Sequence, residues 1–419
     1  MTGTAQPPGD VVISGIGAVT PLGTGREVTW QGLLAGRSGV DTISAFDARF
    51  LPTRIAAEVR GFDATSVMNG KRARRSDRAS QFAVAAAREA ADDAKLEISS
   101  DNAARIGVIV NAAVAGFSAI EAATRGLLAR PASIAPASWF VPSSLTNMPA
   151  CEVAVDLGIH GPVNASALAC ASGLYALLEA RHLIRSGEAD AVLCGGTDAA
   201  ITEVMFAGLV KMGAMSERND DPAGASRPFA ADRDGFVFGE GAVVLVVESA
   251  EHAARRGITP YAALAGGALT CDAFHISAPD PTAEHATAAI RQAQARSGLK
   301  PADIDYICAH GTSTVANDVT ETKAIRAALG PAADRVTVSA PKSMVGHMIG
   351  AAGALGAMVC ALAIRDGIVP PTINLNVPDP QCDLDYVPLT ARRASIGAAL
   401  TNAFGFGGQN CVAVFKALD

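Results

Sequence analysis

The chain has 419 residues, of which 49% are hydrophobic and 18% charged, and its formal net charge is −7. This composition supplies a large core and excludes a disordered chain or a coiled coil, and the acidic balance argues against a nucleic-acid partner. The eight cysteines form no Cys-x-x-Cys pair, and residues 1–8 lack the basic and apolar regions of a signal peptide. We therefore expect a reducing, cytoplasmic compartment.

The first part of the chain combines apolar strand patterns with one basic run. Residues 106–111 read Ile-Gly-Val-Ile-Val-Asn, which predicts a buried strand that enters a turn of small residues. Before it, residues 71–78 read Lys-Arg-Ala-Arg-Arg-Ser-Asp-Arg. Such a run is usually a solvated helix face, but on an acidic chain we favour a docking surface for an acidic protein. Its candidate residues are Lys71, Arg72, Arg74 and Arg75.

A lone cysteine marks the centre of the chain. In residues 164–173, Asn-Ala-Ser-Ala-Leu-Ala-Cys-Ala-Ser-Gly, small residues surround Cys170 where an extended run gives way to a helical pattern over 174–184. A cysteine at a helix N-terminus meets unpaired amides and the helix dipole, which favour the thiolate. Cys170 is therefore the predicted nucleophile. The other seven are predicted to be inert small hydrophobic residues: Cys151, Cys194, Cys271, Cys308, Cys360, Cys382 and Cys411.

Two histidine turns follow in the second part. The segments Cys308-Ala-His310-Gly-Thr-Ser-Thr314 and Lys342-Ser-Met-Val-Gly-His347 each place a histidine beside a glycine, on a turn that can aim an imidazole inward. One nucleophile and two imidazoles suit a reaction with covalent and decarboxylative steps. No His-x-x-x-His or Cys/His pair has metal-ligand spacing, so no metal site is predicted. The remaining histidines are assigned to the surface or the core: His160, His182, His252 and His285.

The order of these segments suggests two similar halves. The helical stretches after Cys170 and His347 end alike, in Leu-Ile-Arg-Ser-Gly at 183–187 and Ala-Ile-Arg-Asp-Gly at 363–367. Strands that alternate with helices predict parallel sheets, with the two weakly charged helices stacked between them. We expect halves at residues 10–255 and 256–419. The 17-residue uncharged run at 348–364 is rich in Gly and Ala, so it is predicted to be a buried helix and not a membrane span.

Taken together, these segments closely resemble the β-ketoacyl-acyl carrier protein synthases. The resemblance runs from Val11 to Asn410 and also covers 215–220, 226–229 and 233–241, all in family order. It implies a thiolase-like, five-layered αβαβα sandwich and a decarboxylative Claisen condensation of an enzyme-bound acyl thioester with malonyl-acyl carrier protein. It also implies substrates carried on phosphopantetheine, no bound cofactor, and a dimer with itself or with a chain-length-factor homologue. The pathway is either fatty-acid or type II polyketide elongation.

The same resemblance implies a role for each site residue. Cys170 is the nucleophile, and its own amide and that of Phe406 form the oxyanion hole. His310 and His347 hold the malonyl thioester oxygen, with electrostatic support from Lys342. Binding roles fall to four residues: Thr312 and Thr314 for the phosphopantetheine arm, Phe404 for substrate, and Val114 for the pocket floor. The threonines also suit backbone bonds beside a glycine turn, Val114 also suits the core, and His275 suits either a gating loop or an ordinary one.

Two departures from the family pattern point to a specialised paralogue. Gly356 stands where relatives carry a glutamate, which leaves Glu321 as the candidate carboxylate partner of Lys342. Leu168 stands two residues before the nucleophile, where a threonine is common. Two other classes stay open: a non-condensing, chain-length-factor-like partner, which would lack the nucleophile, and a thiolase, which needs a second catalytic cysteine near the C-terminal glycine loop.

Overall fold

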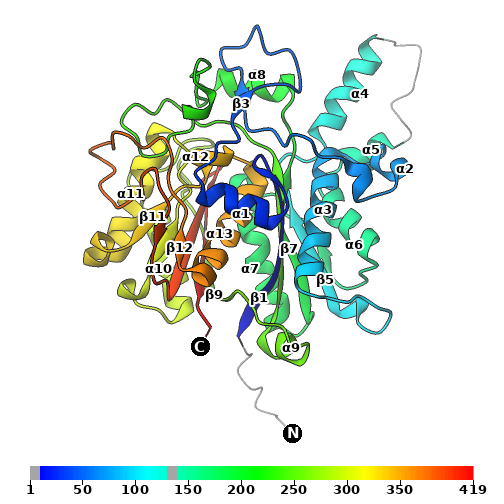
Figure 1. Ribbon diagram of the computed structural model, residues 1–419. Helices are drawn as coiled ribbons and strands as arrows, with labels where there is room; N and C mark the ends of the chain where they lie inside the picture. The colour runs from blue at the N-terminus through cyan, green and yellow to red at the C-terminus, as the bar shows by residue number, and fades with distance from the viewer. Residues whose placement is uncertain (1–9, 130–138, 419) are drawn as a thin grey trace.

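Two sets of five strands with the same connectivity make up most of the central sheet, and the short strand β2 (Gly23–Thr24) pairs with β1 beside them. The computed structural model describes residues 10–129 and 139–418 (Figure 1). One set runs β6-β5-β7-β8-β1 and the other β11-β10-β14-β15-β9. The first comprises β1 (Val11–Thr20), β5 (Ile106–Asn111), β6 (Val163–Asn164), β7 (Ala191–Asp198) and β8 (Gly241–Ser249). The second comprises β9 (Ala262–Cys271), β10 (Tyr306–Cys308), β11 (Thr337–Ser339), β14 (Ala398–Gly405) and β15 (Gln409–Lys416).

The sheets are mixed, so the prediction of parallel sheets is wrong in part. In each set the three outer strands pair in parallel, whereas the next two pairings are antiparallel. The reason is visible at β14 and β15, which are joined by only three residues, 406–408. So short a connection makes a hairpin, because a parallel crossover needs a dozen residues or more. The two sets meet where β1 pairs with β9 at Val12↔Ala263 and Ile13↔Ala262.

Helices form three layers around the two sets of strands (Figure 1). Helices α3 (Arg78–Asp93) and α6 (Met148–Leu157) cover the first set, and α10 (Glu284–Ser297) and α11 (Val315–Leu329) lie on the side of the second. Helices α7 (Ser172–Arg185) and α13 (Ala352–Asp366) lie between the sets and contact strands of both. The remaining helices are α1 (Arg26–Leu34), α2 (Gly70–Ala73), α4 (Phe117–Ala129), α5 (Phe140–Ser144), α8 (Glu203–Lys211), α9 (Ala250–Arg255) and α12 (Lys342–Val345).

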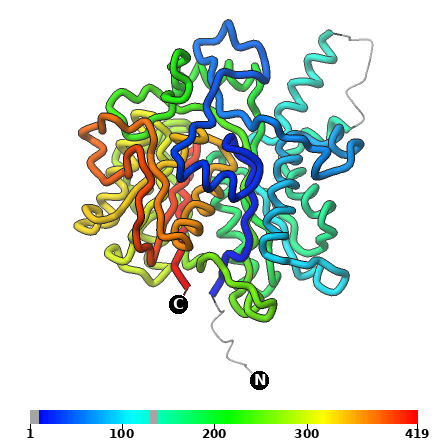
Figure 2. The backbone as a smooth tube through the Cα atoms, viewed as in Figure 1, coloured from blue at the N-terminus to red at the C-terminus, as the bar shows by residue number. Residues whose placement is uncertain are grey.

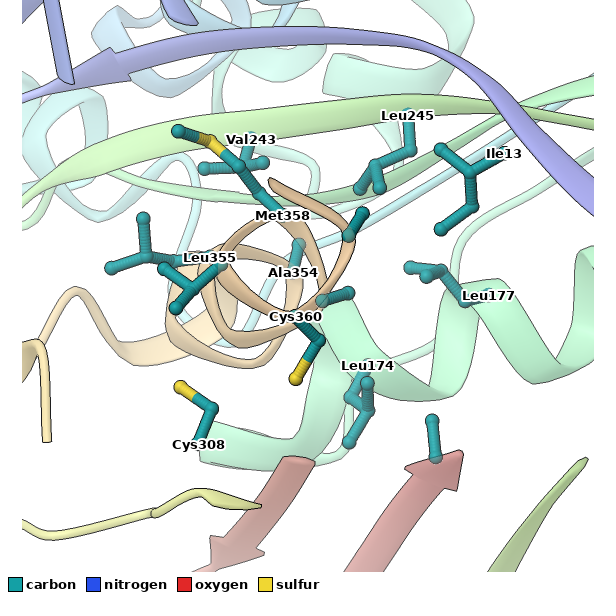
Figure 3. Close-up of a cluster of buried hydrophobic side chains, with 14 of the residues drawn as sticks. Ile13, Leu174, Leu177, Val243, Leu245, Cys308, Ala354, Leu355, Met358 and Cys360 are labelled. Atoms are coloured by element: carbon teal, nitrogen blue, oxygen red, sulfur yellow. The ribbon is translucent and has the colours of Figure 1, made fainter. Parts of the chain in front are cut away.

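Helix α13 is the centre of the hydrophobic core. Figure 3 shows its residues Ala354, Leu355 and Met358 packed among side chains of α7, β1 and β8. The segment Ile349–Asp366 is long and apolar enough to cross a membrane, but 78% of it is buried inside the protein. The predicted buried helix is therefore confirmed.

The inner helices approach each other closely because small residues face one another. A Cβ atom added at Gly173 of α7 would lie 2.4 Å from the carbonyl oxygen of Gly350. One added at Gly353 of α13 would lie 2.7 Å from the Leu174 side chain. Larger residues would separate the helices, and the segments that precede them would separate as well. These segments carry Cys170 and His347, so the glycine packing brings the two predicted catalytic segments together.

The connectivity places the junction of the halves between β8 and β9. Strand β8 ends at Ser249 and β9 begins at Ala262, with α9 between them. The predicted division at residues 255 and 256 falls in this connection and stays a prediction. Lys416 and Val12 both lie opposite Ala263 in the sheet, so the described chain begins and ends at one end of the molecule (Figure 2). Helices α8 and α12 lie at the opposite end (Figure 1).

Candidate active site

A cavity of about 740 Å³ brings together residues from both halves of the chain. Cys170 lines it from the segment before α7, and His310 and His347 line it from the turns after β10 and α12. The turn between β14 and β15 closes another side. The four residues predicted to bind substrate also line this cavity, as does Phe406 from the β14–β15 turn: Val114, Thr312, Thr314 and Phe404.

Cys170 lies in a short 3-10 turn, Ala169–Ala171, directly before α7. Ala169 has a positive φ of 46°, a conformation held by the amide of Leu168, which donates to the Ser172 hydroxyl at 2.9 Å. A Cβ atom at Gly405 would lie 2.8 Å from the carbonyl oxygen of Leu168 and 3.3 Å from the nitrogen of Cys170. A residue larger than glycine at 405 would therefore push the Phe406 segment away from the nucleophile.

The predicted resting thiolate at Cys170 is wrong. The residue is buried, and burial raises the pKa of its thiol to about 11. Lys342 and the amides of Phe406 and of Cys170 itself favour the thiolate but do not offset the loss of solvation. The resting nucleophile is therefore a thiol at neutral pH, and it must lose its proton as it attacks.

This pKa predicts a steep pH dependence for alkylation of Cys170. Below a pKa of about 11, the thiolate fraction rises roughly tenfold per pH unit, so the iodoacetamide rate constant should rise in the same way from about pH 7 to pH 9.5. Modification is followed by mass spectrometry of the Cys170 peptide, with Cys271→Ser present to remove an exposed competing thiol. A rate that is flat over this range would indicate the thiolate instead.

The rings of His310 and His347 lie next to each other in the lining of the cavity, and both are neutral. Their ring centroids lie 5.4 Å apart at an interplanar angle of 85°. Burial, and the positive charge of Lys342 after it, lower the pKa of both imidazoles well below the usual range. His347 Nδ1 accepts from the amide of Ile349 at 3.2 Å, and His310 Nδ1 lies 3.4 Å from the Lys342 ammonium. Both Nδ1 atoms are acceptors, which assigns each ring proton to Nε2.

The environment of Lys342 differs from the expectation of a direct carboxylate partner. Its ammonium is buried and donates to the carbonyl of His310 at 2.5 Å. The oxygens of Glu321 instead accept from the amides of His310 at 2.7 Å and Gly311 at 2.8 Å, and from the Asn402 side chain at 2.9 Å. Glu321 thus binds the backbone amides of the histidine turn. The negative charge of Glu321 also favours the charged form of Lys342, although the two side chains make no hydrogen bond.

Gly356 of α13 is packed against strand β14. A Cβ atom at this position would lie 2.3 Å from the hydroxyl oxygen of Thr401 and 3.6 Å from the Cys308 sulfur. Thr401 in turn donates to the carbonyl of Cys308 at 3.0 Å. The space beside Gly356 is thus filled by Thr401, and a glutamate would fit only if that residue moved.

The residues predicted to bind substrate combine structural and cavity-lining contacts. The hydroxyls of Thr312 and Thr314 lie 2.8 Å apart, and Thr314 also accepts from the Asn317 amide at 3.4 Å, at the start of α11. The Phe404 ring centroid is 5.7 Å from that of His310. Phe406 is 42% exposed, the property expected of a residue at the mouth of the cavity.

Helix α8 supplies a part of the cavity wall that was not predicted from the sequence. Met205, Leu209 and Met212 line the cavity together with Phe236 and Phe238. The signal was present, since residues 203–212 place apolar side chains three and four apart, but the pattern has no chemical motif. This wall gives the cavity an apolar surface suited to an alkyl chain.

The loop that contains His275 also lines the cavity. Its residues 277–280 face the cavity, and His275 Nδ1 accepts from the amides of Ser277 and Ala278, each at 3.1 Å. The imidazole therefore holds the turn of its own loop. Cys271, at the start of this segment, is exposed, so it is not the buried hydrophobic residue that its prediction as an inert small hydrophobic residue implies, and Cys151 is only half-buried.

The basic run divides into exposed and internally paired residues. Lys71 and Arg74 are exposed. Arg72 is half-buried: its guanidinium lies 3.0 Å from Glu152 and also pairs with Asp156. These ion pairs give Arg72 a structural role inside the chain, and its predicted role in docking stays a prediction. The Arg75 guanidinium stacks 4.0 Å above the ring centroid of Trp139.

Comparisons with known proteins agree with this geometry. The family model described as Beta-ketoacyl synthase, N-terminal domain, matches residues 9–253, and that of the C-terminal domain matches 261–376. The 3-oxoacyl-[acyl-carrier-protein] synthase 2 of Synechocystis sp. is 47% identical over 97% of each chain, and that of Coxiella burnetii is 45% identical over 96% of each.

Solved structures are similar over nearly the whole chain. One is the ishigamide ketosynthase/chain length factor, with a TM-score of 0.92, 36% identity, and coverage of 98% of this chain and 100% of that one. Another, a type II PKS acyl-carrier protein in complex with its ketosynthase bound to the hexaketide, has a TM-score of 0.91, 33% identity and the same coverage. The predicted thiolase-like fold is confirmed.

Proposed function

The chain belongs to the β-ketoacyl synthase family, and from this premise we propose that it elongates acyl chains by decarboxylative condensation. An acyl group carried by Cys170 is joined to two carbons from malonyl-acyl carrier protein. The observation that carries the proposal is the cavity in which one cysteine, two neutral imidazoles and an apolar wall meet. Because Cys170 is present, a non-condensing partner subunit is the weaker assignment.

In the first step, the acyl group moves to the protein. The Cys170 sulfur bonds to the carbonyl carbon of the incoming thioester, the bond to the carrier sulfur breaks, and the carrier leaves as a thiol. The proton lost by Cys170 balances the one gained by the carrier. Negative charge develops on the carbonyl oxygen, for which we assign the amides of Cys170 and Phe406 as donors. A fixed donor of this kind typically lowers the barrier by about 3 kcal/mol.

In the second step, the malonyl thioester loses carbon dioxide. The bond to the carboxylate carbon breaks, and its electron pair forms an enolate with negative charge on the thioester oxygen. Neutral imidazoles that carry their protons on Nε2 are suited to donate to this oxygen, and we assign His310 and His347 to that role. The enolate carbon then attacks the acyl carbonyl, the bond to Cys170 breaks, and the 3-oxoacyl product leaves on the carrier. The proton consumed in this step returns Cys170 to its thiol.

The apolar wall favours saturated acyl chains as substrates. Val114 and the residues of the α8 segment that line the cavity, Met205, Leu209 and Met212, offer no hydrogen-bond donor to the keto groups of a polyketide chain. The higher identity to 3-oxoacyl-[acyl-carrier-protein] synthase 2 points the same way, so we place the protein in fatty-acid elongation. A role in type II polyketide elongation is the second candidate, favoured by the structural similarity to ketosynthases of that kind and by the two departures from the family pattern.

A reconstituted condensation assay tests both candidates. The purified protein is mixed with malonyl carrier protein and with acyl carriers of increasing chain length, and carbon dioxide and 3-oxoacyl products are measured. One extension of a saturated chain per turnover supports fatty-acid elongation. Repeated extension without ketone reduction supports the polyketide role, and no carbon dioxide release in any mixture would reject the function.

We further propose that the partner is an acyl carrier protein that delivers substrates on phosphopantetheine. Thr312 and Thr314 line the cavity and remain our candidates for the phosphopantetheine arm. Lys71 and Arg74 are exposed cations on a chain of net charge −7, so they form a local site for an acidic carrier.

Strand β6 ends the sheet with both residues exposed, which supports a homodimer or a heterodimer with a chain-length-factor homologue. We place the protein in the cytoplasm.

Charge reversal at the exposed cations should weaken use of the carrier selectively. The double variant Lys71→Glu/Arg74→Glu is expected to raise KM for the acyl carrier about tenfold, and more at low than at high salt, because salt screens the attraction. The measurement is steady-state kinetics with acyl carrier and with an N-acetylcysteamine thioester, which needs no carrier and should be used almost normally.

A matched variant separates docking from folding. Arg72→Glu breaks the pairing with Glu152 and Asp156, so it should lower thermal stability and impair both substrates alike. Equal losses with both substrates in the Lys71→Glu/Arg74→Glu variant would show that these two residues are also structural and that the carrier binds elsewhere.

A further inference from the structure

A buried carboxylate links the cavity wall to the segment that follows His347. Asp198, the last residue of β7, is fully buried. Its Oδ1 accepts from the amide of Val114 at 2.8 Å, and its Oδ2 accepts from the amides of Ala113 at 3.1 Å and Gly350 at 2.7 Å. Within residues 10–129 and 139–418, no cationic side chain pairs with it, so backbone amides alone satisfy its oxygens.

Each amide belongs to a segment with a place in the site. Val114 lines the cavity. Gly350 lies in the 3-10 turn Ile349–Ala351, and the neighbouring amide of Ile349 donates to His347 Nδ1. That bond is the one that leaves the ring proton of His347 on Nε2. The amide of Ile349 sets the tautomer of His347, and the next amide, that of Gly350, donates to Asp198. The same carboxylate accepts from the amide of Val114 in the cavity wall.

Gly350 and the Asp198 carboxylate are packed so closely that neither can take a larger side chain without displacing the other. A Cβ atom at Gly350 would lie 2.5 Å from Asp198 Oδ2 and 3.0 Å from the Ala113 nitrogen. Burial, together with the charge of Asp77, raises the pKa of Asp198 to about 7, and the three amides oppose this rise. A carboxylate this costly to bury persists where fixed donors surround it.

A second buried carboxylate provides an internal comparison. Asp77 holds the same loop from its other side, accepting from the amide of Gly116 at 3.2 Å and from the Ser118 hydroxyl. It also accepts from the amide of Ala79 at 3.1 Å, at the start of its own helix. None of these groups belongs to residues 347–350, so Asp77 shares the cavity-wall contact of Asp198 without the contact to the histidine segment.

We propose that Asp198 is a positioning residue that sets the acyl-binding wall at Val114 and the His347 turn against each other. The inference rests on the proposed function, because it assumes an acyl chain beside Val114 and a malonyl thioester beside His347. Asp198 touches neither substrate. It acts by fixing two backbone segments, so its loss should disturb chain-length preference and decarboxylation together.

The test compares Asp198→Asn with Asp77→Asn in the full-length protein. Asparagine keeps the shape, but its single oxygen cannot serve all three amides, and its NH₂ group opposes at least one of them. Asp198→Asn should lower malonyl-carrier decarboxylation about tenfold or more and change the kcat/KM ratio of long to short acyl carriers at least about threefold. Asp77→Asn should change the ratio alone, with decarboxylation within about twofold of the unmodified protein.

Other outcomes would overturn the inference. If the two variants lose both activities equally and in proportion to their thermal stability, Asp198 only stabilises the fold. If Asp198→Asn does not fold, Gly350→Ala pushes on the same carboxylate from the other side at a residue with an ordinary φ, and undiminished decarboxylation in it would contradict the proposal. Decarboxylation absent from the unmodified protein would reject the proposed function, whereas an active protein with an unaffected Asp198→Asn variant rejects this inference alone.

Discussion

Replacing Cys170 with glutamine is expected to abolish condensation and leave malonyl decarboxylation running. Glutamine has no sulfur to carry the acyl group, so 3-oxoacyl product should fall by about 10⁴-fold or more. Its side-chain carbonyl is placed to accept from the amides of residues 170 and 406, as an acylated cysteine would. His310 and His347 remain in the variant to hold the enolate oxygen. Mass spectrometry of products and a carbon dioxide assay measure the two reactions separately.

Cys308 offers a matched control for this variant. Burial raises the pKa of its thiol to about 11, as at Cys170, and Lys342 opposes the rise at both. Cys308 does not line the cavity, so Cys308→Ala should keep condensation within a few-fold of normal. Condensation that survives Cys170→Gln, or that is lost in Cys308→Ala, would contradict the assignment of the nucleophile.

The state of Cys170 shows where local reasoning from the sequence ends. The position before α7 was predictable, since small residues and a change of pattern mark it. The thiolate was not, because its prediction weighed only the helix end, whose effect is typically about 1 kcal/mol or less. Burial acts in the opposite direction: it raises the pKa of a thiol, and the free energy of this effect is several times larger than that of the helix end. The extent of burial depends on Gly405 and the β14–β15 turn, more than two hundred residues away in the sequence.

Partners distant in sequence account for the other corrections. The motifs predicted which residues meet in the cavity, because each motif keeps its chemistry within a few residues. The pairing of Arg72 with Glu152 and Asp156 was not predicted, because these partners lie 80 and 84 residues later in the sequence and give no local signal. Glu321 was expected to meet Lys342 and instead binds backbone amides. Asp198 carries no motif at all, and only the folded chain places the amides of Val114 and Gly350 around it.

Replacing His310 or His347 with alanine is expected to have the opposite effect to Cys170→Gln: malonyl decarboxylation should fall, whereas acylation of Cys170 should persist. Either variant removes one Nε2–H donor from the developing enolate, which should lower malonyl decarboxylation by about 100-fold or more. Transfer of the acyl group to Cys170 should persist, because its oxyanion is held by backbone amides.

Both imidazoles are buried and neutral, with pKa values well below the usual range. In the unmodified protein, protonation of these rings should therefore not reduce decarboxylation between about pH 6 and pH 8.

The acyl-protein intermediate and carbon dioxide release are measured in parallel for these histidine variants. His182→Ala is the control, since His182 is exposed near the end of α7 and does not line the cavity. Asparagine at 310 or 347 restores a neutral N–H donor, so it should recover part of the rate that alanine loses, whereas a residue needed only for packing would show no such recovery. Lost acylation with normal decarboxylation would mean that the histidines serve the first step, as the bases that take the proton of the buried Cys170 thiol, and not the second.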